Sequence, residues 1–196
     1  MHVRPIQPQD APIVARLHIE GIKTGFISLL GIDFVTALYQ SIAESENSFG
    51  FVAEENSTII GFAAFTANLN RLYKSIILKK GCHFAFLLAG KMFSLKRIGR
   101  MLETLFYPRR TRRLNMPAAE LLSVAVAPEN CRRGLATRLV KEGLQQCQEK
   151  GIDRIKVLVG ADNQQANKLY VKCGFELAGQ ITSHGIVSNV YVAKTG

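Results

Sequence analysis

ELLSVAVAPENCRRGLATRLV, which spans Glu120 to Val140, is the stretch that indicates most about how this chain folds. Its first residues, 120–126, are almost continuously apolar, as is typical of a central strand that is buried on both faces. A polar loop follows, and from Gly134 onward the apolar residues recur at helical spacing. The sequence therefore predicts a buried strand that leads through a short loop into a helix.

The loop and the first turn of this helix are suited to hold an anion. The first backbone N–H groups of a helix have no partner within the helix and lie at the positive end of its dipole. Gly134 and Ala136 are small enough to let a diphosphate approach the backbone, and Arg132 and Arg133 add positive charge. Two commoner phosphate motifs, GxxxxGK with Ser or Thr and GxGxxG after the first expected strand, are absent. Taken alone, the segment could also be an ordinary helix start packed on a sheet.

A second segment, residues 163–175, follows the next expected strand and reads NQQANKLYVKCGF. Asn163, Ala166 and Tyr170 are spaced three and four residues apart, so they share one face of a helix. Together the two segments resemble the GNAT N-acetyltransferase superfamily, whose members use acetyl-coenzyme A. The resemblance is specific over these segments, and it extends more loosely over the strand order of the chain outside a basic stretch described below.

The periodicity and the resemblance together imply an α/β (α+β) chain with the GNAT fold. We expect a mixed, mostly antiparallel central sheet of about six to seven strands flanked by helices, with a helical insertion between the third and fourth strands. The length favours one acyltransferase domain over residues 1–196, with the basic helical insertion at 70–116. Expected strands cover residues 2–6, 49–54, 58–66, 120–126, 155–159, 175–182 and 186–192, and expected helices cover 8–23, 33–44, 134–150 and 164–172.

The resemblance also implies where acetyl-coenzyme A binds. The family's pyrophosphate loop has Gln or Arg, two further residues, Gly, any residue, and Gly or Ala, and here it reads Cys131-Arg-Arg-Gly-Leu-Ala136. The loop amides are expected to cradle the pyrophosphate, and the preceding strand to pair with the pantetheine arm. Cys131 departs from the family pattern, and Arg132 or Arg133 is the expected compensation. The implied cofactor-binding residues are Val124, Ala125, Val126, Arg132, Arg133, Gly134, Leu135, Ala136, Thr137 and Asn163.

Two residues are implied as catalytic. Tyr170 matches the family's tyrosine near the thioester sulfur, where a phenol can protonate the departing thiolate. Glu120 heads the central strand, where some family members hold a general base, and an alkyl ammonium acceptor with a pKa of about 10 must lose a proton before it attacks. The Val124 amide is the candidate donor to the oxyanion. The alternatives are a tyrosine packed against the sheet and a surface carboxylate at a strand end.

Other polar residues have plainer interpretations. Asn163 could simply cap the helix that follows, although Asp162 is the expected N-cap of that helix. Cys131 is expected to be a small filler rather than a nucleophile, and Ser123 is expected to lie in the core. His184 is expected in a solvated hairpin turn, with a place in the acceptor groove as the alternative.

The positive charge of the chain is concentrated in one segment. The formal net charge is +10, from 25 Lys and Arg against 15 Asp and Glu, and twelve of the basic residues with a single acid, Glu103, lie within 71–113. Apolar residues alternate with the basic ones, which predicts one or two amphipathic helices broken near Gly81 or Gly90 and ended at Pro108. The face is either solvated or docks an anionic acceptor, a membrane surface or nucleic acid.

We expect an N-acetyltransferase that moves an acetyl group from acetyl-coenzyme A to a primary amine by direct attack in a ternary complex. The acceptor is expected to be a small amine-bearing metabolite, such as an amino sugar or amino acid derivative. One alternative is a protein N-terminal or lysine acetyltransferase. Another is a non-catalytic coenzyme A-binding module tethered through the basic insertion to a membrane or nucleic acid.

The composition narrows the setting. The longest apolar runs are a few residues, whereas a membrane span needs about 20, and no secretory signal is visible. The four cysteines are scattered without a CxxC pair, so we expect no metal and a cytoplasmic location. A homodimer is compatible with the sequence, which does not determine the oligomeric state.

Overall fold

A seven-stranded sheet forms the centre of the computed structural model, which describes residues 1–22, 27–89, 116–183 and 186–196. Its strands are β1 (His2–Pro5), β2 (Ser48–Glu55), β3 (Thr58–Thr66), β4 (Ala119–Val126), β5 (Arg154–Gly160), β6 (Glu176–Ser183) and β7 (Ile186–Lys194). Their order is β1-β2-β3-β4-β5-β7-β6, and only the pair β4–β5 is parallel. The expected mixed, mostly antiparallel sheet is therefore confirmed.

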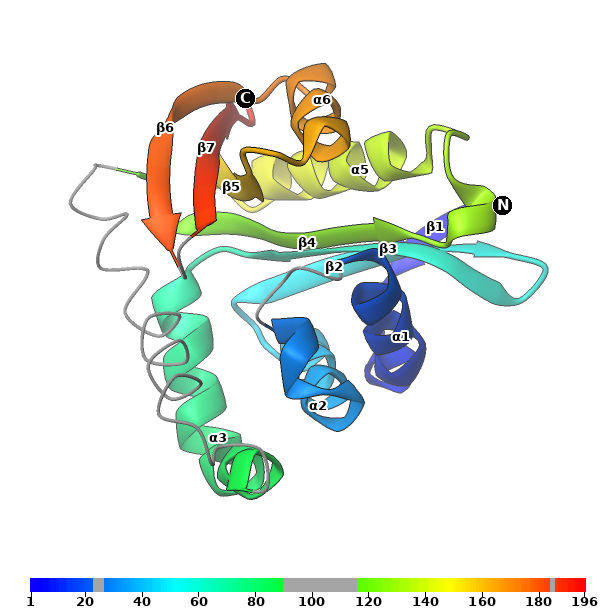
Figure 1. Cartoon of the computed structure of the whole chain (residues 1–196), viewed down its shortest axis with the longest axis vertical. Coiled ribbons are helices and arrows are strands. Elements are labelled where there is room, and N and C mark those ends of the chain that lie inside the picture. Colours follow the sequence, from blue (N-terminus) through cyan, green and yellow to red (C-terminus); the bar gives the residue numbers. More distant parts are fainter. Residues whose placement is uncertain (23–26, 90–115, 184–185) are drawn as a thin grey trace.

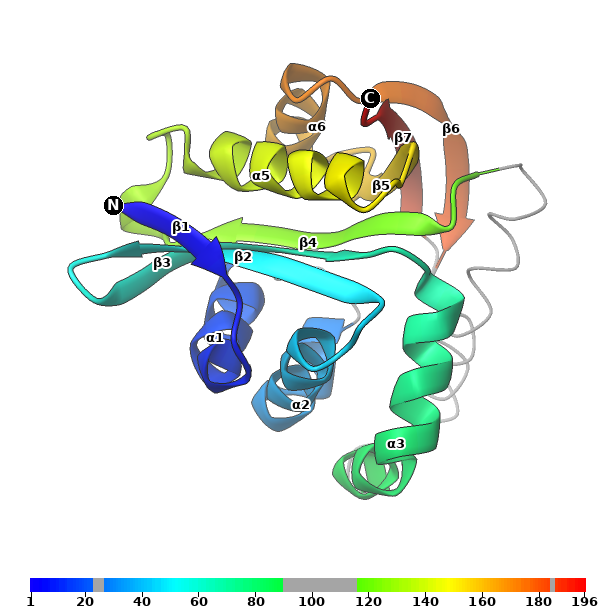
Figure 2. The same ribbon diagram turned by 180° about the vertical axis from the view of Figure 1, so that it is seen from behind.

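Helices cover both faces of this sheet (Figures 1 and 2). One face carries α1 (Ala11–Gly21) and α2 (Ile32–Ala43), with α3 (Leu69–Ala89) beside α2. The other face carries α5 (Leu135–Glu149) and α6 (Gln164–Lys172). Short 3-10 turns lie at Pro8–Asp10, Ile27–Leu30 and Pro128–Asn130, so the expected first helix begins with a 3-10 turn before α1. Each face of the sheet accordingly has its own hydrophobic core.

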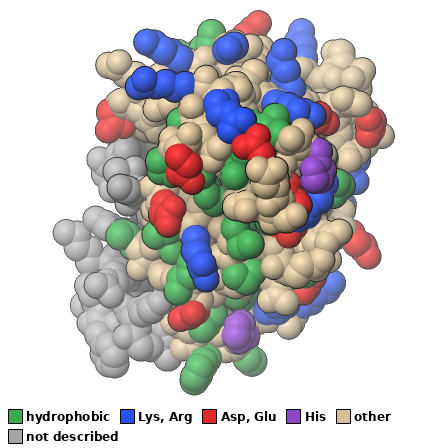
Figure 3. Space-filling view, turned by 90° about the vertical axis from the view of Figure 1, so that its right-hand side faces the viewer, with side chains coloured by type: hydrophobic (Ala, Val, Ile, Leu, Met, Phe, Trp, Pro, Cys, Tyr) green, Lys and Arg blue, Asp and Glu red, His purple; other side chains and the backbone are tan. Residues whose placement is uncertain are grey.

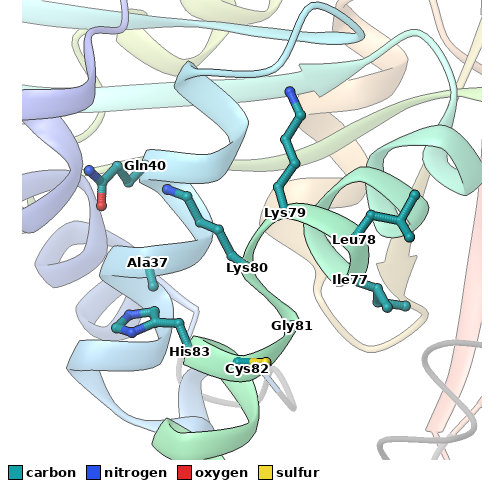
Figure 4. A pocket seen from close by; sticks show the side chains of 9 residues that line it. All are labelled: Ala37, Gln40, Ile77, Leu78, Lys79, Lys80, Gly81, Cys82 and His83. Carbon is teal, nitrogen blue, oxygen red and sulfur yellow. The ribbon is translucent and has the colours of Figure 1, made fainter.

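The helix α3 lies in the first part of the expected insertion between the third and fourth strands. The Leu69 amide at its start donates to the carbonyl of Ala118 (3.2 Å), so the helix starts beside the residue that precedes β4. The helix bends at Gly81 but continues to Ala89, so the break expected there is a bend within one helix (Figure 4). The predicted break near Gly90 and the predicted end at Pro108 concern residues 90–115, which lie outside the described residues.

A buried chain of hydrogen bonds joins α1, α2 and β4. Nδ1 of His18 lies 2.6 Å from the hydroxyl of Tyr39, and that hydroxyl lies 2.6 Å from Oγ of Ser123. All three side chains are buried, as expected for Ser123, and Nε2 of His18 has no hydrogen-bond partner among the described residues. Burial lowers the pKa of His18 to about 4, so its imidazole is neutral at pH 7.

This pKa predicts that acid destabilises the fold through His18. Between pH 6.5 and about 4 the unfolded chain binds a proton that the folded chain excludes, so the free energy of unfolding falls as the pH falls. We expect urea unfolding to show a loss of about 2 kcal/mol from His18 between pH 7 and pH 5. In His18→Asn, which keeps a polar group near Tyr39 but does not titrate, the pH dependence should shrink by that amount. An identical pH dependence in both proteins would show that His18 is not held neutral.

The packing of α5 on the sheet requires a glycine. A Cβ at Gly143 would overlap the ring of Phe65, which is fully buried in β3 and stacks on Phe49 with ring centroids 5.2 Å apart. Alanine is favoured over glycine within helices by about 1 kcal/mol, but overpacking a core costs about 1–3 kcal/mol. Steric overlap with Phe65 should therefore outweigh helix propensity at this position.

We expect Gly143→Ala to lower the free energy of unfolding by about 1–2 kcal/mol, measured by urea denaturation. The matched control is Gly81→Ala in α3, where a Cβ would meet nothing within 4 Å. That variant should be neutral or gain up to about 1 kcal/mol. A Gly143→Ala protein as stable as Gly81→Ala would contradict this account of the packing.

Candidate active site

The parallel strands β4 and β5 pair briefly and then separate. They are paired at three positions, Ala119 with Ile155, Glu120 with Lys156, and Leu121 with Val157. Beyond these, β4 continues to Val126 and β5 to Gly160 with no further pairing between them in these fully described strands. Among the described residues, one backbone edge of β4 therefore has no strand partner over residues 124–126, as pairing with an extended ligand would require.

A β-bulge lies where β4 leaves β5. Ser123 pairs with Ala64 and Leu121 pairs with Phe65, so Leu122 is the extra residue in β4. A bulge bends its strand and increases the local twist, which helps β4 to diverge from its neighbour. After the bulge, Val124 packs with the core under α5 and Ala125 packs with the core under α1.

The end of β4 leads into the expected anion-binding loop. Arg132 and Gly134 both have left-handed backbones, with φ of +63° and +78°, and α5 begins directly after Gly134. The first intrahelical bond of this helix runs from the Arg138 amide to the Gly134 carbonyl (3.0 Å). The amides of Leu135, Ala136 and Thr137 therefore lie in the first turn, where backbone N–H groups have no helical partner. This geometry suits a phosphate group.

The two arginines of the loop have different surroundings. Arg133 makes a bidentate contact with Glu55, at 3.0 and 2.8 Å, and holds the loop against the β2–β3 turn. Arg133 also lowers the pKa of Glu55 through these hydrogen bonds. Arg132 is exposed and forms no ion pair with any residue in the described part of the chain. Arg132 is thus the cation free to compensate for the family's missing Gln or Arg.

Cys131 does not fill space in the interior. Its side chain is exposed, and its Sγ lies 3.5 Å from the Ala127 carbonyl oxygen. The interpretation of Cys131 as a small filler is therefore wrong, because its side chain is exposed. Figure 3 shows Lys and Arg side chains gathered on the upper part of one face, at the level where Figure 1 places α5 and α6.

Tyr170 projects from α6 into the core beneath it. It is 5% exposed, and its ring lies 5.7 Å from that of Phe175 and 6.4 Å from that of Tyr191. Burial raises the pKa of Tyr170 above its usual value, so the phenol keeps its proton at neutral pH. The residue is both packed against the sheet and in the protonation state that a general acid needs.

The start of α6 is capped by Asn163. Its Oδ1 accepts a hydrogen bond from the Ala166 amide (3.1 Å), so the assignment of Asp162 as the N-cap was wrong. Asn167, which sequence reasoning missed, ties this helix to its surroundings. Its Nδ2 donates to the carbonyls of Asn163 (2.7 Å) and Gly160 (3.0 Å), and its Oδ1 accepts from the β7 residues Asn189 and Tyr191 at 2.7 and 3.0 Å.

Glu120 is buried at the point where β4 and β5 are still paired. Its Oε2 lies 3.2 Å from Nζ of Lys156, and the two residues are opposite each other in the strand register. Burial raises the pKa of Glu120, an effect that the charge of Lys156 partly offsets. The alternative of a surface carboxylate is wrong, because Glu120 is 8% exposed. Lys156 was missed in the sequence, where it stands alone among the apolar residues of a strand.

Tyr73, in the first turns of α3, lies close enough to Glu120 for the charge of that carboxylate to affect it. Burial raises the pKa of Tyr73, and the negative charge of Glu120 raises it further. Tyr73, Glu120 and Lys156 thus bring α3, β4 and β5 together at one place. The acceptor side is also expected to include the loop 24–31 and the hairpin around His184. Residues 24–26 and His184 lie outside the described residues, while the rest of that loop contains the 3-10 turn Ile27–Leu30.

Other features of the described residues do not compete with this site. A hollow of about 510 Å³ lies between α2 and the bend of α3, lined by Gln40 and residues 77–83 (Figure 4), and it contains none of the predicted site residues. Within the described ranges, no three His, Cys, Asp or Glu side chains are grouped as a metal site would require. No described helix has the length and apolar character needed to cross a membrane.

The sequence and the fold both have known relatives. The chain matches the Acetyltransferase (GNAT) family model over residues 22–175. It is 41% identical over 59 residues to a mycothiol acetyltransferase of Corynebacterium aurimucosum, a match that covers 30% of this chain and 19% of that protein's length. The structure is similar to an N-acetyltransferase of Staphylococcus aureus Mu50, with a TM-score of 0.64, 16% identity and coverage of 100% of this chain and 98% of that one.

A second similar structure contains the family's cofactor. The PaiA N-acetyltransferase of Thermoplasma acidophilum in complex with coenzyme A has a TM-score of 0.60 and 16% identity, and the match covers 99% of each chain. At these identities the solved structures show a shared fold, while the family model covers most of this sequence. The chain therefore belongs to the Acetyltransferase (GNAT) family, whose members transfer acetyl groups from acetyl-coenzyme A.

Proposed function

We propose that this protein is an N-acetyltransferase that transfers an acetyl group from acetyl-coenzyme A to a primary amine by direct attack in a ternary complex. The observation that carries the proposal is the free edge of β4, which leads directly into the amide-rich start of α5. An extended thioester arm can pair with that edge while its diphosphate lies at the positive end of the helix.

The cofactor residues act mainly through their backbones. Val124, Ala125 and Val126 offer the β4 edge to the pantetheine arm, and the amides over 132–137 surround the pyrophosphate. Bound acetyl-coenzyme A supplies the activated acetyl group. The Oδ1 of Asn163 is used as a helix cap, so its Nδ2 is the group left to contact the cofactor.

The catalytic residues divide the proton transfers. Glu120 accepts a proton from the acceptor ammonium, directly or through a water, and the free amine then attacks the thioester carbonyl. The Val124 amide donates a hydrogen bond to the carbonyl oxygen as negative charge develops there. Tyr170 would give its hydroxyl proton to the sulfur as the C–S bond breaks, and the proton that the acylated nitrogen then loses would restore the phenol. The raised pKa of each side chain suits its role, because it makes the carboxylate a stronger base and keeps the phenol protonated.

A small acceptor is favoured over a protein by the burial of Glu120. The carboxylate is 8% exposed and is faced by Tyr73 from α3, so an amine must enter a confined space to reach it. An amino sugar or amino acid derivative can do so more readily than a folded protein surface can. An acceptor that also bears phosphate or carboxylate fits the basic residues of α3, because opposite charges attract.

Arg132 and Arg133 should contribute unequally to cofactor affinity. Arg133 is already paired with Glu55, whereas Arg132 is free to contact a phosphate. We expect Arg132→Ala to raise the dissociation constant for coenzyme A about tenfold, as loss of one charge-assisted contact would. Arg133→Ala is the matched control and should raise it less than threefold. Calorimetric titration measures both constants, and a larger loss in Arg133→Ala would contradict this assignment.

The function itself is tested by release of the coenzyme A thiol. We expect the wild-type protein to release thiol from acetyl-coenzyme A when a library of small primary amines is added, and to release less with amine-bearing peptides. Glu120→Gln should lower turnover at least tenfold with little change in coenzyme A affinity, because the base is lost and the β4 edge is kept.

Three results would count against this scheme. Coenzyme A binding without thiol release for every amine would favour the non-catalytic module. Faster release with peptides would favour a protein acceptor. Wild-type turnover in Glu120→Gln would remove Glu120 from the role of base.

A further inference from the structure

A lysine is buried beside the proposed base. Lys156 is 2% exposed, and lysine side chains are almost never buried to this extent unless they are paired. Its Nζ lies 2.6 Å from the carbonyl oxygen of Pro117 and 3.2 Å from Oε2 of Glu120. The position follows from the strand register, because Glu120 and Lys156 face each other across β4 and β5 just before these strands separate.

We infer that Lys156 is a positioning residue for acyl transfer. It keeps the Glu120 carboxyl group ionised and in place where the acceptor amine must lose its proton. The inference rests on the proposed function, because it requires Glu120 to be the base. It adds a residue from β5 to a reaction otherwise assigned to β4 and α6.

The hydrogen-bond geometry leaves the base free to react. The ammonium of Lys156 donates to the Pro117 carbonyl, while Oε2 of Glu120 has no hydrogen-bond partner among the described residues. Oε2 thus has a cation 3.2 Å away but meets no donor in hydrogen-bond geometry among the described residues, so that oxygen keeps a lone pair available to accept a proton. A base whose oxygens were all engaged in hydrogen bonds would have to break one before it could act.

Electrostatics explain why the lysine is needed. Burial disfavours the charged form of a carboxyl group, and Tyr73 from α3 offers no positive charge to counter this. Among the described groups that act on the Glu120 charge, Lys156 is the one that favours the ionised form. Without it, the carboxyl group would hold its proton to a higher pH and would be unable to take one from the acceptor.

The ammonium also links the base to the inserted segment. Pro117 lies two residues before β4 begins its pairing with β5, and the neighbouring Ala118 carbonyl accepts from the first residue of α3. Lys156 therefore contacts both the Glu120 carboxylate and Pro117, which lies in the segment that leads into β4. Loss of the Pro117 contact alone is a structural effect, and the test must separate it from loss of charge.

The experiment compares pH profiles of turnover from pH 5.5 to 9.5. In Lys156→Met, the rise of kcat with pH should move at least one pH unit higher. Turnover at pH 7 should fall at least tenfold and recover toward pH 9, with KM for acetyl-coenzyme A within twofold of the wild type. Lys156→Gln, which can still donate to Pro117, should show the same shift, whereas Lys156→Arg should keep the wild-type profile.

Two further variants make the outcomes distinguishable. Ser41→Ala in α2 also removes a buried hydrogen bond (2.8 Å to the Ala37 carbonyl), and it should leave the pH profile unchanged. If Lys156→Met and Lys156→Gln fold and keep the wild-type profile, Lys156 does not act on the base and the inference is overturned. If Glu120→Gln turns over like the wild type, the proposed base fails first, whatever the lysine variants do.

Discussion

The separation of β4 from β5 after three paired positions governs the arrangement of this molecule. While the strands are paired, their side chains can form a closed core and a buried ion pair. Once they part, β4 has backbone hydrogen-bonding groups that have no strand partner in the described part of the chain. The bulge at Leu122 lies at this transition, and the strand then leads to the helix start that suits a phosphate. Under the proposed function, the cofactor site and the catalytic site are successive parts of one strand.

An ion pair lies near each end of β4. Glu120 and Lys156 form a buried ion pair where β4 and β5 separate. Burying these two charges costs desolvation free energy that apolar residues would not incur. Such a pair is weak evidence of stability, so its position beside the free edge of β4 points to chemistry. At the other end of β4, Arg133 is held by Glu55 while Arg132 is left for a ligand. Under the proposed function, the two ends of β4 therefore separate the residues that transfer protons from those that bind phosphate.

The sequence predicted the features that depend on local patterns of residues. Hydrophobic periodicity indicated the strands and helices, and the Gly134–Ala136 spacing indicated the anion site. The sequence alone could not predict features that depend on the register in which the strands pair. Lys156 looks like an isolated lysine until its pairing with Glu120 is known, and Asn167 gains its role only when β7 lies beside α6. The exposure of Cys131 depends on loop conformation, which composition does not determine.

We propose that the unpaired edge of β4 and the start of α5 together form the cofactor site. Backbone amide shifts in an ¹H–¹⁵N spectrum, followed during titration with coenzyme A, test it most directly. The amides of 124–126 and 132–137 should shift together and saturably, while those of Gln40 and 77–83, which line the hollow beside α3, should not shift. Shifts confined to that hollow, with the β4 edge unchanged, would contradict it.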